Sequence, residues 1–349
     1  MDKILLENCC EILDSKRIPI TASERKAGPY PYYGANGVQD YVADYIFDDE
    51  LVLLAEDGGN FGSKEKPIAY RVSGKCWVNN HAHVLKPKPG INVDYLCYSL
   101  MFYNTDGLVN GATRQKLTQA TMRKMLIPQK SEEEQLQIVK LLNNVVDIID
   151  KRKQQFQQLD ELVKARFVEL FGDYDLSHVQ DDWKPIFEIG QVVGGATPKT
   201  NVDEFWDGEY RWITPAELQA DSGYIYDSVR KLTKAGVESC SLQEMPIGTV
   251  ILSSRAPIGK VAIAGNTFYC NQGFKNIICN KEILPRYLYT VLLLNTDYLN
   301  SLGRGATFKE ISKSIVENIK VPVPSIDLQN EFANFVKEVD KSKFVVQKA

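Results

Sequence analysis

The sequence is poor in the residues that build disulfide frameworks, metal sites and membrane spans. Among 349 residues there are 7 Cys and 3 His, and no two cysteines are spaced as Cys-x-x-Cys. This argues against a disulfide framework and against a zinc site. No segment has the roughly 20 apolar residues of a membrane-spanning helix, and the start MDKILLENCC lacks the apolar core of a signal peptide. We therefore expect a cytoplasmic protein that binds no metal.

The chain also lacks an excess of positive charge. It has 41 basic and 45 acidic side chains and a net charge of −4, which excludes a uniformly basic nucleic-acid binder. A basic face on one side of the molecule stays possible, because a phosphate responds to the local field. The length corresponds to about two domains at roughly 150 residues each.

An internal repeat organises the chain. Residues 111–128 (GATRQKLTQATMRKMLIP) match residues 305–322 (GATFKEISKSIVENIKVP) at a shift of 194. Further upstream, a looser match at a shift of 192 places Asn79 on Asn271. Such an ordered series of matches indicates a tandem duplication. Each copy has a variable globular part followed by a shared helical part.

The globular parts contain short β-branched and aromatic runs separated by Gly, Asn and Pro, a pattern that predicts strands. We expect strands at 41–47, 50–56, 248–254 and 260–265, and helices at 94–104 and 285–300. Each globular part is therefore predicted to be a mixed α/β (α+β) domain.

A long helix is predicted after the first GAT element. Residues 131–171 begin with a capping box and contain no Pro or Gly. Their apolar residues recur at steps of four and three, as in a coiled-coil seam, with interruptions at Arg152 and Arg166. The seam starts again at Phe332 and stops about 16 residues sooner. Since the shorter helix is marginal alone, we expect it to lie antiparallel along the long one.

This organisation predicts four segments. They are two globular parts, 1–110 and 174–304, and two helical parts, each with its GAT element, 111–173 and 305–349. An antiparallel coiled-coil spacer would place the globular parts at opposite ends of a pseudo-twofold dumbbell.

Two similar modules on a helical spacer resemble the specificity (S) subunit of Type I restriction–modification enzymes. In copy one the resemblance is carried by RIPIT (17–21), GPYPYYGANGVQDYV (28–42), LLAEDGGNFG (53–62) and WVNNHAHVLKP (77–87). In copy two it is carried by GGATPKT (194–200), RWITPAEL (211–218), SSRAPIGKVAIA (253–264) and NQGFKNI (271–277).

The resemblance implies two target-recognition domains, each reading one half of a bipartite sequence in double-stranded DNA. It also implies that the helices set the gap between the halves and dock methyltransferase (M) subunits, two per S subunit, which restriction (R) motor–nuclease subunits join. The partner subunits would use S-adenosylmethionine, ATP and Mg, and this chain would hold none of them.

The catalytic motifs of those activities are missing from the sequence. There is no G-x-x-x-x-G-K-[ST] phosphate loop, and no Asn/Asp-Pro-Pro-Tyr/Phe element of an amino-methyltransferase. We therefore expect a non-catalytic DNA-binding subunit. Two alternatives stay open: a fused or cryptic restriction enzyme, and a protein adaptor with two binding modules.

Polar, basic and aromatic loop residues are the candidates for DNA contact, because base discrimination in the major groove uses Arg, Lys, Asn and Gln. In copy one they are Arg25, Lys26, Tyr32, Tyr33, Asn36, Asn80, His81, His83, Arg114 and Lys116. In copy two they are Thr197, Lys199, Arg211, Ser254, Arg255, Lys260, Gln272, Lys275, Arg304 and Lys309. The GAT turns are further candidates for phosphate contact through backbone amides, although a plain helix start with a solvated face fits them equally.

A second set of candidates concerns partner docking on the long helix. These are Arg152, Arg166, Phe167, Leu170 and Phe171. The arginines interrupt an apolar seam and must find a carboxylate, which a partner subunit could supply, or reach water at the edge. The aromatic end extends beyond the reach of the shorter helix. Alternatively, acids of the shorter helix pair with the arginines and the globular part covers the phenylalanines.

Overall fold

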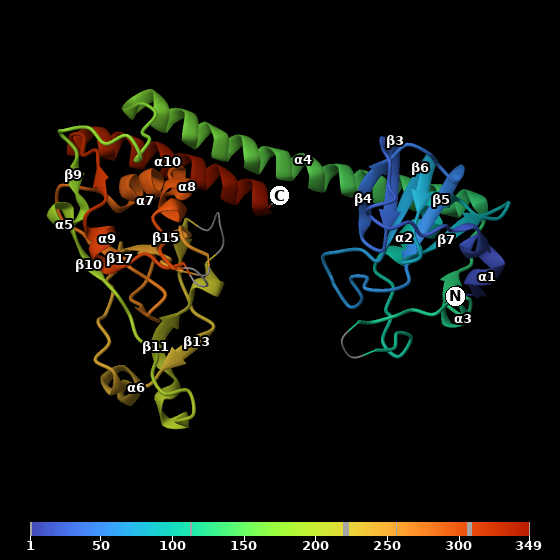
Figure 1. Cartoon of the computed structure of the whole chain (residues 1–349), viewed down its shortest axis with the longest axis horizontal. Helices are drawn as coiled ribbons and strands as arrows, with labels where there is room; N and C mark the ends of the chain where they lie inside the picture. Colours follow the sequence, from blue (N-terminus) through green and yellow to red (C-terminus); the bar gives the residue numbers. More distant parts are fainter. Residues whose placement is uncertain (1, 112–113, 219–222, 256, 306–308, 349) are drawn as a thin grey trace. The chain divides into compact units, whose positions relative to one another are not determined.

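Two units and one long helix make up the chain. The computed structural model describes residues 2–111, 114–218, 223–255, 257–305 and 309–348, with side chains as far as 343. The contacts divide it into unit 1, residues 1–151, and unit 2, residues 152–349. Helix α4 (Glu132–Phe171) belongs to both (Figure 1). In the described ranges, no helix combines the length and apolarity needed to cross a membrane.

Unit 1 is built on a six-stranded sheet. In spatial order its strands are β2 (Cys10–Ile12), β7 (Ala82–Pro87), β5 (Phe47–Ala55), β6 (Ala69–Val78), β3 (Ala27–Gly34) and β4 (Gly37–Val42). Neighbours are antiparallel except β3 and β6, which are parallel. A separate antiparallel pair joins β1 (Lys3–Leu5) to β8 (Leu126–Pro128). The short helices are α1 (Leu6–Cys9), α2 (Val93–Met101) and α3 (Gln119–Met122).

The prediction of one strand at 41–47 is wrong. Val42 ends β4 and Phe47 begins β5. Asp44 turns the chain between them, because its carboxylate accepts the backbone N–H of Tyr45 (2.8 Å) and such local bonds favour turns. The other predicted strands and both predicted helices are confirmed, with shorter or divided bounds.

Unit 2 is also built on a β-sheet, and the strands of its largest sheet are shorter than those of unit 1. A five-stranded sheet has the order β10 (Gly190–Val193), β17 (Asn276–Cys279), β14 (Val250–Leu252), β15 (Val261–Ala264) and β12 (Tyr224–Ile225). The smaller sheets are β13 (Arg230–Leu232), β11 (Trp206–Ile213) and β16 (Tyr269–Cys270), and the pair β18 (Lys320–Val321) and β9 (Lys184–Pro185). The helices are α5 (Ile186–Ile189), α6 (Lys234–Ser239), α7 (Pro285–Leu294), α8 (Thr296–Ser301), α9 (Lys313–Glu317) and α10 (Ile326–Lys348).

A buried glutamine joins the globular part of unit 1 to its helix. The side-chain oxygen of Gln135 accepts the backbone N–H of Asn92 (2.8 Å), at the start of α2. Its amide nitrogen donates to the carbonyl oxygens of Gly90 (2.9 Å) and Lys130 (3.0 Å). The side chain is 1% exposed. The buried amide therefore has a partner for each of these bonds, and a buried polar group without partners would be costly.

Unit 2 repeats these bonds. The oxygen of Gln329 accepts the N–H of Leu284 (2.8 Å), and its nitrogen donates to the carbonyl oxygens of Glu282 (3.0 Å) and Pro324 (2.8 Å). The partners in the two units lie 192 or 194 residues apart, which are the shifts read from the sequence. The predicted duplication is confirmed at the level of single hydrogen bonds.

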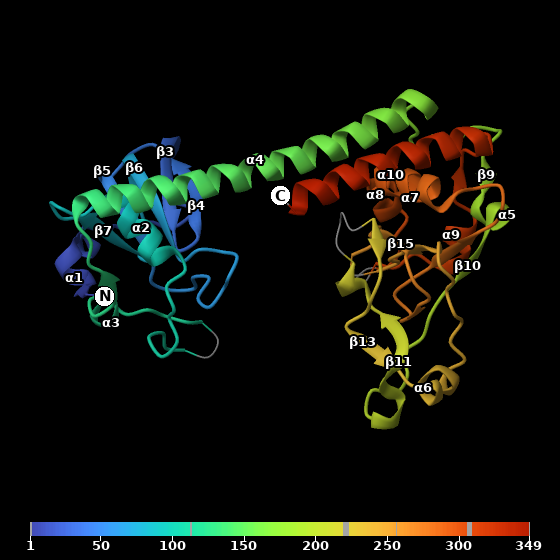
Figure 2. The same ribbon diagram turned by 180° about the vertical axis from the view of Figure 1, so that it is seen from behind.

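The two helices of the repeat pack antiparallel within unit 2. Arg166 of α4 pairs with Glu331 of α10 (2.5 Å), and Asp160 of α4 pairs with Lys343 of α10. From the first pair to the second, the residue number falls in α4 and rises in α10, so the two helices run in opposite directions (Figure 2). This confirms the predicted antiparallel pairing for residues 160–171.

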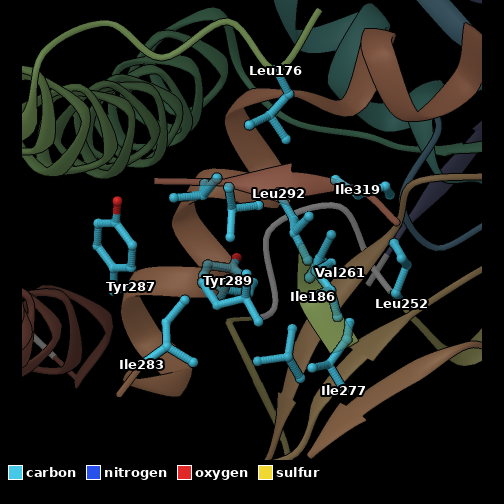
Figure 3. Close-up of a cluster of buried hydrophobic side chains, with 14 of the residues drawn as sticks. Leu176, Ile186, Leu252, Val261, Ile277, Ile283, Tyr287, Tyr289, Leu292 and Ile319 are labelled. Carbon is cyan, nitrogen blue, oxygen red and sulfur yellow. The ribbon is translucent and has the colours of Figure 1, made fainter. Parts of the chain in front are cut away.

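The prediction that the aromatic end of α4 is left open for a partner is wrong. Phe167 and Phe171 are only 1% and 8% exposed, because their rings pack on Tyr287 of α7 and Phe332 of α10, with centroids 4.9–5.7 Å apart. Leu170 packs against the same core. Figure 3 shows Tyr287 among the aliphatic side chains of this core.

The arginines that interrupt the seam find partners in their own chain. Arg166 bridges Glu169 (2.7 Å) and Glu331. Arg152 is half-buried and its guanidinium donates to the side-chain oxygen of Gln155 (3.2 Å). Arg166 therefore follows the alternative interpretation, in which acids of the shorter helix pair with the arginines.

We predict that Phe167→Ala lowers the free energy of unfolding of unit 2 by about 3–5 kcal/mol, because it removes a buried aromatic side chain from a packed cluster. Val168→Ala is the matched control, since Val168 is 38% exposed one position along the same helix. Denaturant unfolding of the purified variants measures both. Equal stabilities of the two variants would contradict the assignment of Phe167 to the core.

Candidate nucleic-acid interface

The same asparagine turn follows one strand of each unit. After β6, the side-chain oxygen of Asn79 accepts the backbone N–H of His81 (2.8 Å). After β16, the side-chain oxygen of Asn271 accepts the backbone N–H of Gly273 (2.9 Å). Asparagine favours such turns because its short side chain reaches the backbone two residues on. The predicted match of the two asparagines is confirmed, and the residue after each is exposed.

Each GAT loop is closed by a pair of backbone hydrogen bonds. Asn110 and Lys116 exchange N–H···O bonds of 3.0 and 2.8 Å, and Arg304 and Glu310 exchange bonds of 3.1 and 3.0 Å. The two pairs are 194 residues apart, so the loops are structural equivalents. They project the basic side chains of the repeat from a fixed base.

Glycine is required at the first position of each loop. Gly111 and Gly305 have φ values of 103° and 124°, a conformation that only glycine adopts readily. The Ala and Thr of each element, at 112–113 and 306–307, lie outside the described residues. Phosphate contact by these turns stays a prediction.

Each loop is anchored on the end of a central strand. The N–H of Leu117 donates to the carbonyl oxygen of Glu56 after β5 (2.8 Å), and the N–H of Ile311 donates to that of Ser254 after β14 (3.0 Å). Ser254 has no exposed surface, so the prediction that its side chain contacts DNA is wrong. We call the asparagine turn, the closed GAT loop and this anchor the strand-end framework.

His83 is also buried, and the prediction that it contacts DNA is wrong. Its Nδ1 lies 2.6 Å from Oδ2 of Asp14, and its Nε2 lies 2.9 Å from the carbonyl oxygen of Leu117. Since a carbonyl only accepts, Nε2 carries the hydrogen and holds the base of the loop. At a shift of 192 the equivalent is Lys275, whose Nζ lies 3.2 Å from Glu310 in the second loop. A largely buried basic side chain thus anchors each loop.

The acids beside His83 form an ion-pair network. Ligand atoms of Asp14, Glu56 and His83 lie within 4.8 Å of one another, which is close enough for a metal ion. Arg17, however, lies 2.7 Å from Glu56 and 3.6 Å from Asp14, and so forms an ion pair with both carboxylates. Burial raises the pKa of Asp14, but hydrogen bonds, His83 foremost, hold it below its usual value. Burial also raises the pKa of Glu56. The hydrogen bond from Arg17 lowers it, and this pKa too lies below its usual value.

Three predicted side chains of copy one meet at the surface above this network. Nε of Arg114 lies 2.6 Å from Asp57, and Nη2 lies 3.3 Å from Nδ1 of His81. Nζ of Lys116 lies 3.2 Å from Glu56. The arginine and lysine side chains are 58% and 51% exposed. They are therefore held in place and still accessible to an anion.

The other candidates of copy one divide into surface and internal side chains. The exposed ones are Lys26, Asn36 and Asn80. Tyr32 is 1% exposed and its hydroxyl donates to the carbonyl of Ile20 (3.3 Å), so its predicted base contact is wrong. The guanidinium of Arg25 lies 4.2 Å from the centre of the Tyr32 ring. Tyr33 is half-buried beside Tyr70, with ring centroids 5.7 Å apart.

Copy two presents a different set at its strand-end framework. The hydroxyl of Thr197 donates to the side-chain oxygen of Gln272 (2.6 Å), next to the asparagine turn. Arg255 and Lys309 line a cavity of about 690 Å³ together with Asn271 of that turn. The structure therefore brings four predicted residues of copy two to the asparagine turn and the GAT loop.

The remaining candidates of copy two have varied surroundings. Nζ of Lys260 donates to the carbonyl oxygen of Leu218 (2.7 Å), which ties two loops together. Arg211 donates to Asp227 (3.2 Å). The exposed candidates are Lys199 and Arg304.

The sequence did not identify the residues that hold the first loop. Asp14, Arg17 and Glu56 are not conspicuous, because single charged residues near short strands are common. The sequence did contain a signal, because Lys275 is a basic residue at the position equivalent to His83. A shared positioning role for these two side chains could have been inferred from this match.

Comparison with known proteins identifies the family. The model of the Type I restriction modification DNA specificity domain matches residues 2–161 and 180–348. The specificity subunit of Type I restriction enzyme MjaIX from Methanocaldococcus jannaschii is 40% identical over 185 residues, which is 51% of this chain and 43% of that protein. The putative specificity subunit S.HindORF215P from Haemophilus influenzae is 38% identical over 138 residues, or 40% of this chain and 35% of that protein. The chain thus matches less than half the length of these two relatives.

A longer match and two solved structures agree. The EcoR124I/EcoR124II specificity subunit from Escherichia coli is 25% identical over 318 residues, covering 84% of this chain and 72% of that protein. The S subunit of a Type I restriction–modification system from M. genitalium has a TM-score of 0.58 at 15% identity, covering 99% and 91% of the two chains. A chain from a structure of the assembling Type I system has a TM-score of 0.54 at 13% identity, covering 99% and 92%. These two likenesses establish the fold, and the two domain matches establish that the chain belongs to the Type I restriction–modification DNA specificity family.

Proposed function

We propose that this chain is the DNA-recognition subunit of a Type I restriction–modification complex. Unit 1 reads one half of a bipartite target and unit 2 reads the other. The long helix α4 spans about 60 Å at 1.5 Å per residue and sets the gap between the halves.

One observation carries this proposal: the two units share the strand-end framework but present different side chains on it. Unit 1 presents His81 and Arg114, and unit 2 presents Arg255 and Lys309. Side chains of these types contact base edges and phosphates. Two unlike sets of side chains on one framework suit a target made of two unlike halves.

The chain acts without chemistry of its own in this proposal. Methyl transfer and cleavage belong to methyltransferase and restriction subunits that bring S-adenosylmethionine, ATP and Mg. The sequence supports this division, because it has neither a phosphate loop nor the methyltransferase motif. Methyl transfer or cleavage by the purified chain alone would favour the fused-enzyme alternative.

Salt-dependent DNA binding tests the proposal. Replacing Arg114 and Lys116 by glutamine in one variant should weaken binding and reduce the slope of log K against log salt by about two, since each lost phosphate contact removes roughly one unit. Lys140→Gln is the matched control, an exposed lysine on α4 away from the loop. Melting curves check the fold. A protein adaptor would show no such slope in any of the three proteins.

Exchange of one unit tests modularity. Replacing residues 1–131 by the corresponding part of another family member should change one half-site and leave the other unchanged. The junction at 131 keeps the closed loop between Asn110 and Lys116 with its own sheet. Sequencing of DNA selected by the assembled complex gives both half-sites. Changes in both would mean that the units read DNA jointly.

A longer helix tests the spacer. Inserting four helix-forming residues after Lys151 adds about 6 Å, or roughly one turn, without altering either unit. The preferred gap should grow by one or two base pairs, at about 3.4 Å each, with unchanged half-sites. An unchanged gap with altered half-sites would show that α4 is not the ruler.

A further inference from the structure

An acid contacts the exposed arginine on the strand-end framework of unit 1. Nε of Arg114 lies 2.6 Å from Oδ1 of Asp57, and Nη2 of Arg114 donates a hydrogen bond to Nδ1 of His81 (3.3 Å). The same Nδ1 lies 3.5 Å from Oδ2 of Asp57. Asp57 is the least exposed of the three side chains, at 21%. The three side chains form one cluster, and Asp57 contacts both of the others.

The backbone fixes the position of the Asp57 carboxylate. The N–H of Asp57 donates to the carbonyl oxygen of His81 (3.3 Å), and the N–H of Gly58 donates to that of Gln115 in the GAT loop (3.1 Å). Glycine suits position 58 because its φ is 68° and because a Cβ there would lie only 3.3 Å from Nε of Arg114. The asparagine turn and the GAT loop therefore both hold the carboxylate next to the guanidinium.

Unit 2 has the opposite charges at the equivalent positions. The carbonyl that anchors each GAT loop is followed in the chain by Asp57 in unit 1 and by Arg255 in unit 2. On the loop, Lys116 of unit 1 corresponds to Glu310 of unit 2 at a shift of 194. A residue that only stabilised the shared framework would be expected in both units. Asp57 therefore serves a role in which the two units differ.

The carboxylate affects the guanidinium of Arg114 in two ways. It restricts the side chain to one orientation, which reduces the entropy lost when the guanidinium meets an acceptor in the matching position. It also competes with phosphate for the guanidinium. Exposed ion pairs are weak, so DNA can break this one, but only at a cost in binding free energy. The first effect favours DNA with an acceptor in the matching position, and the second disfavours all other DNA.

We propose that Asp57 is a specificity-determining residue of unit 1 that acts through Arg114. On the correct half-site, the oriented guanidinium donates to an acceptor of the DNA while it stays paired with Asp57. On unrelated DNA, the guanidinium must leave Asp57 to reach a phosphate, so binding is weaker. Asp57 is thus a positioning residue that need not touch the DNA. The inference rests on the proposed function, because it requires DNA at the strand-end framework.

Asp57→Asn in the full-length chain tests the inference, since it removes the charge and keeps the shape of the side chain. Binding to a duplex of unrelated sequence should become about two- to fivefold tighter, because the ion pair no longer competes. The slope of log K against log salt on that duplex should steepen by up to about one, as Arg114 becomes free to neutralise a phosphate. Glu65→Gln is the matched control, an exposed acid of the same unit, and should leave both quantities nearly unchanged. Melting curves check the fold of each variant.

A double-mutant cycle tests whether Asp57 acts through Arg114. In a chain that carries Arg114→Gln, the further change Asp57→Asn should bring no gain in binding to unrelated DNA. An equal gain with and without Arg114 would show that Asp57 acts only as a general negative charge, and would overturn the proposal. The absence of any gain in the chain with Arg114 would overturn it as well.

Selection of DNA by the assembled complex gives a second readout, which a merely structural role would not change. Asp57→Asn should make at least one base pair of the half-site read by unit 1 less selective and leave the other half-site unchanged. Reduced selectivity in both half-sites, or in neither, would contradict the role given to Asp57. A wild-type chain without salt-dependent DNA binding would instead refute the proposed function itself, so the two failures are distinct.

Discussion

One buried amide in each unit fixes how the recognition part joins its helix. Gln135 and Gln329 each satisfy three backbone groups, one at the start of a helix of the globular part and two in the segments beside it. The amides themselves are buried, so loss of these partners would leave polar atoms unpaired inside the protein, at a cost of about 1–3 kcal/mol each. Because this bond set starts every spacer helix in the same way, the strand-end framework of a unit has a fixed position relative to the helix that leaves it.

Basic residues have two separate roles on this framework. His83 and Lys275 lie at equivalent positions of the repeat, are largely buried and hold the base of each GAT loop. Arg114 and Lys309 lie on the loops themselves and differ in their neighbours. Because each loop is held from the interior, the surface side chains can differ between the two units without loss of the fold. This agrees with the chain's own pattern, in which a shared helical repeat is joined to two unlike globular parts.

The sequence predicted the features that depend on periodicity and order along the chain. The repeat, α4 and the match of Asn79 to Asn271 were accessible because spacing alone defines them. The direction of individual side chains could not be predicted in this way. By residue type, Tyr32 is as suitable for base contact as any exposed tyrosine, yet it is 1% exposed. The seam placed Arg166 inward, whereas Phe167 is the buried residue. A 3.5-residue repeat drifts from a straight helix by about 20° per heptad, so after four heptads the buried position moves by nearly one residue.

The central claim is that one chain joins two separate DNA readers through a helical spacer of defined length. Sequencing of methylated bases in the genomes of cells with and without the gene tests this most directly. The predicted result is the loss of one motif that has two short defined halves separated by a constant number of unspecified base pairs. Loss of a single continuous motif, or no change in methylation, would contradict the claim.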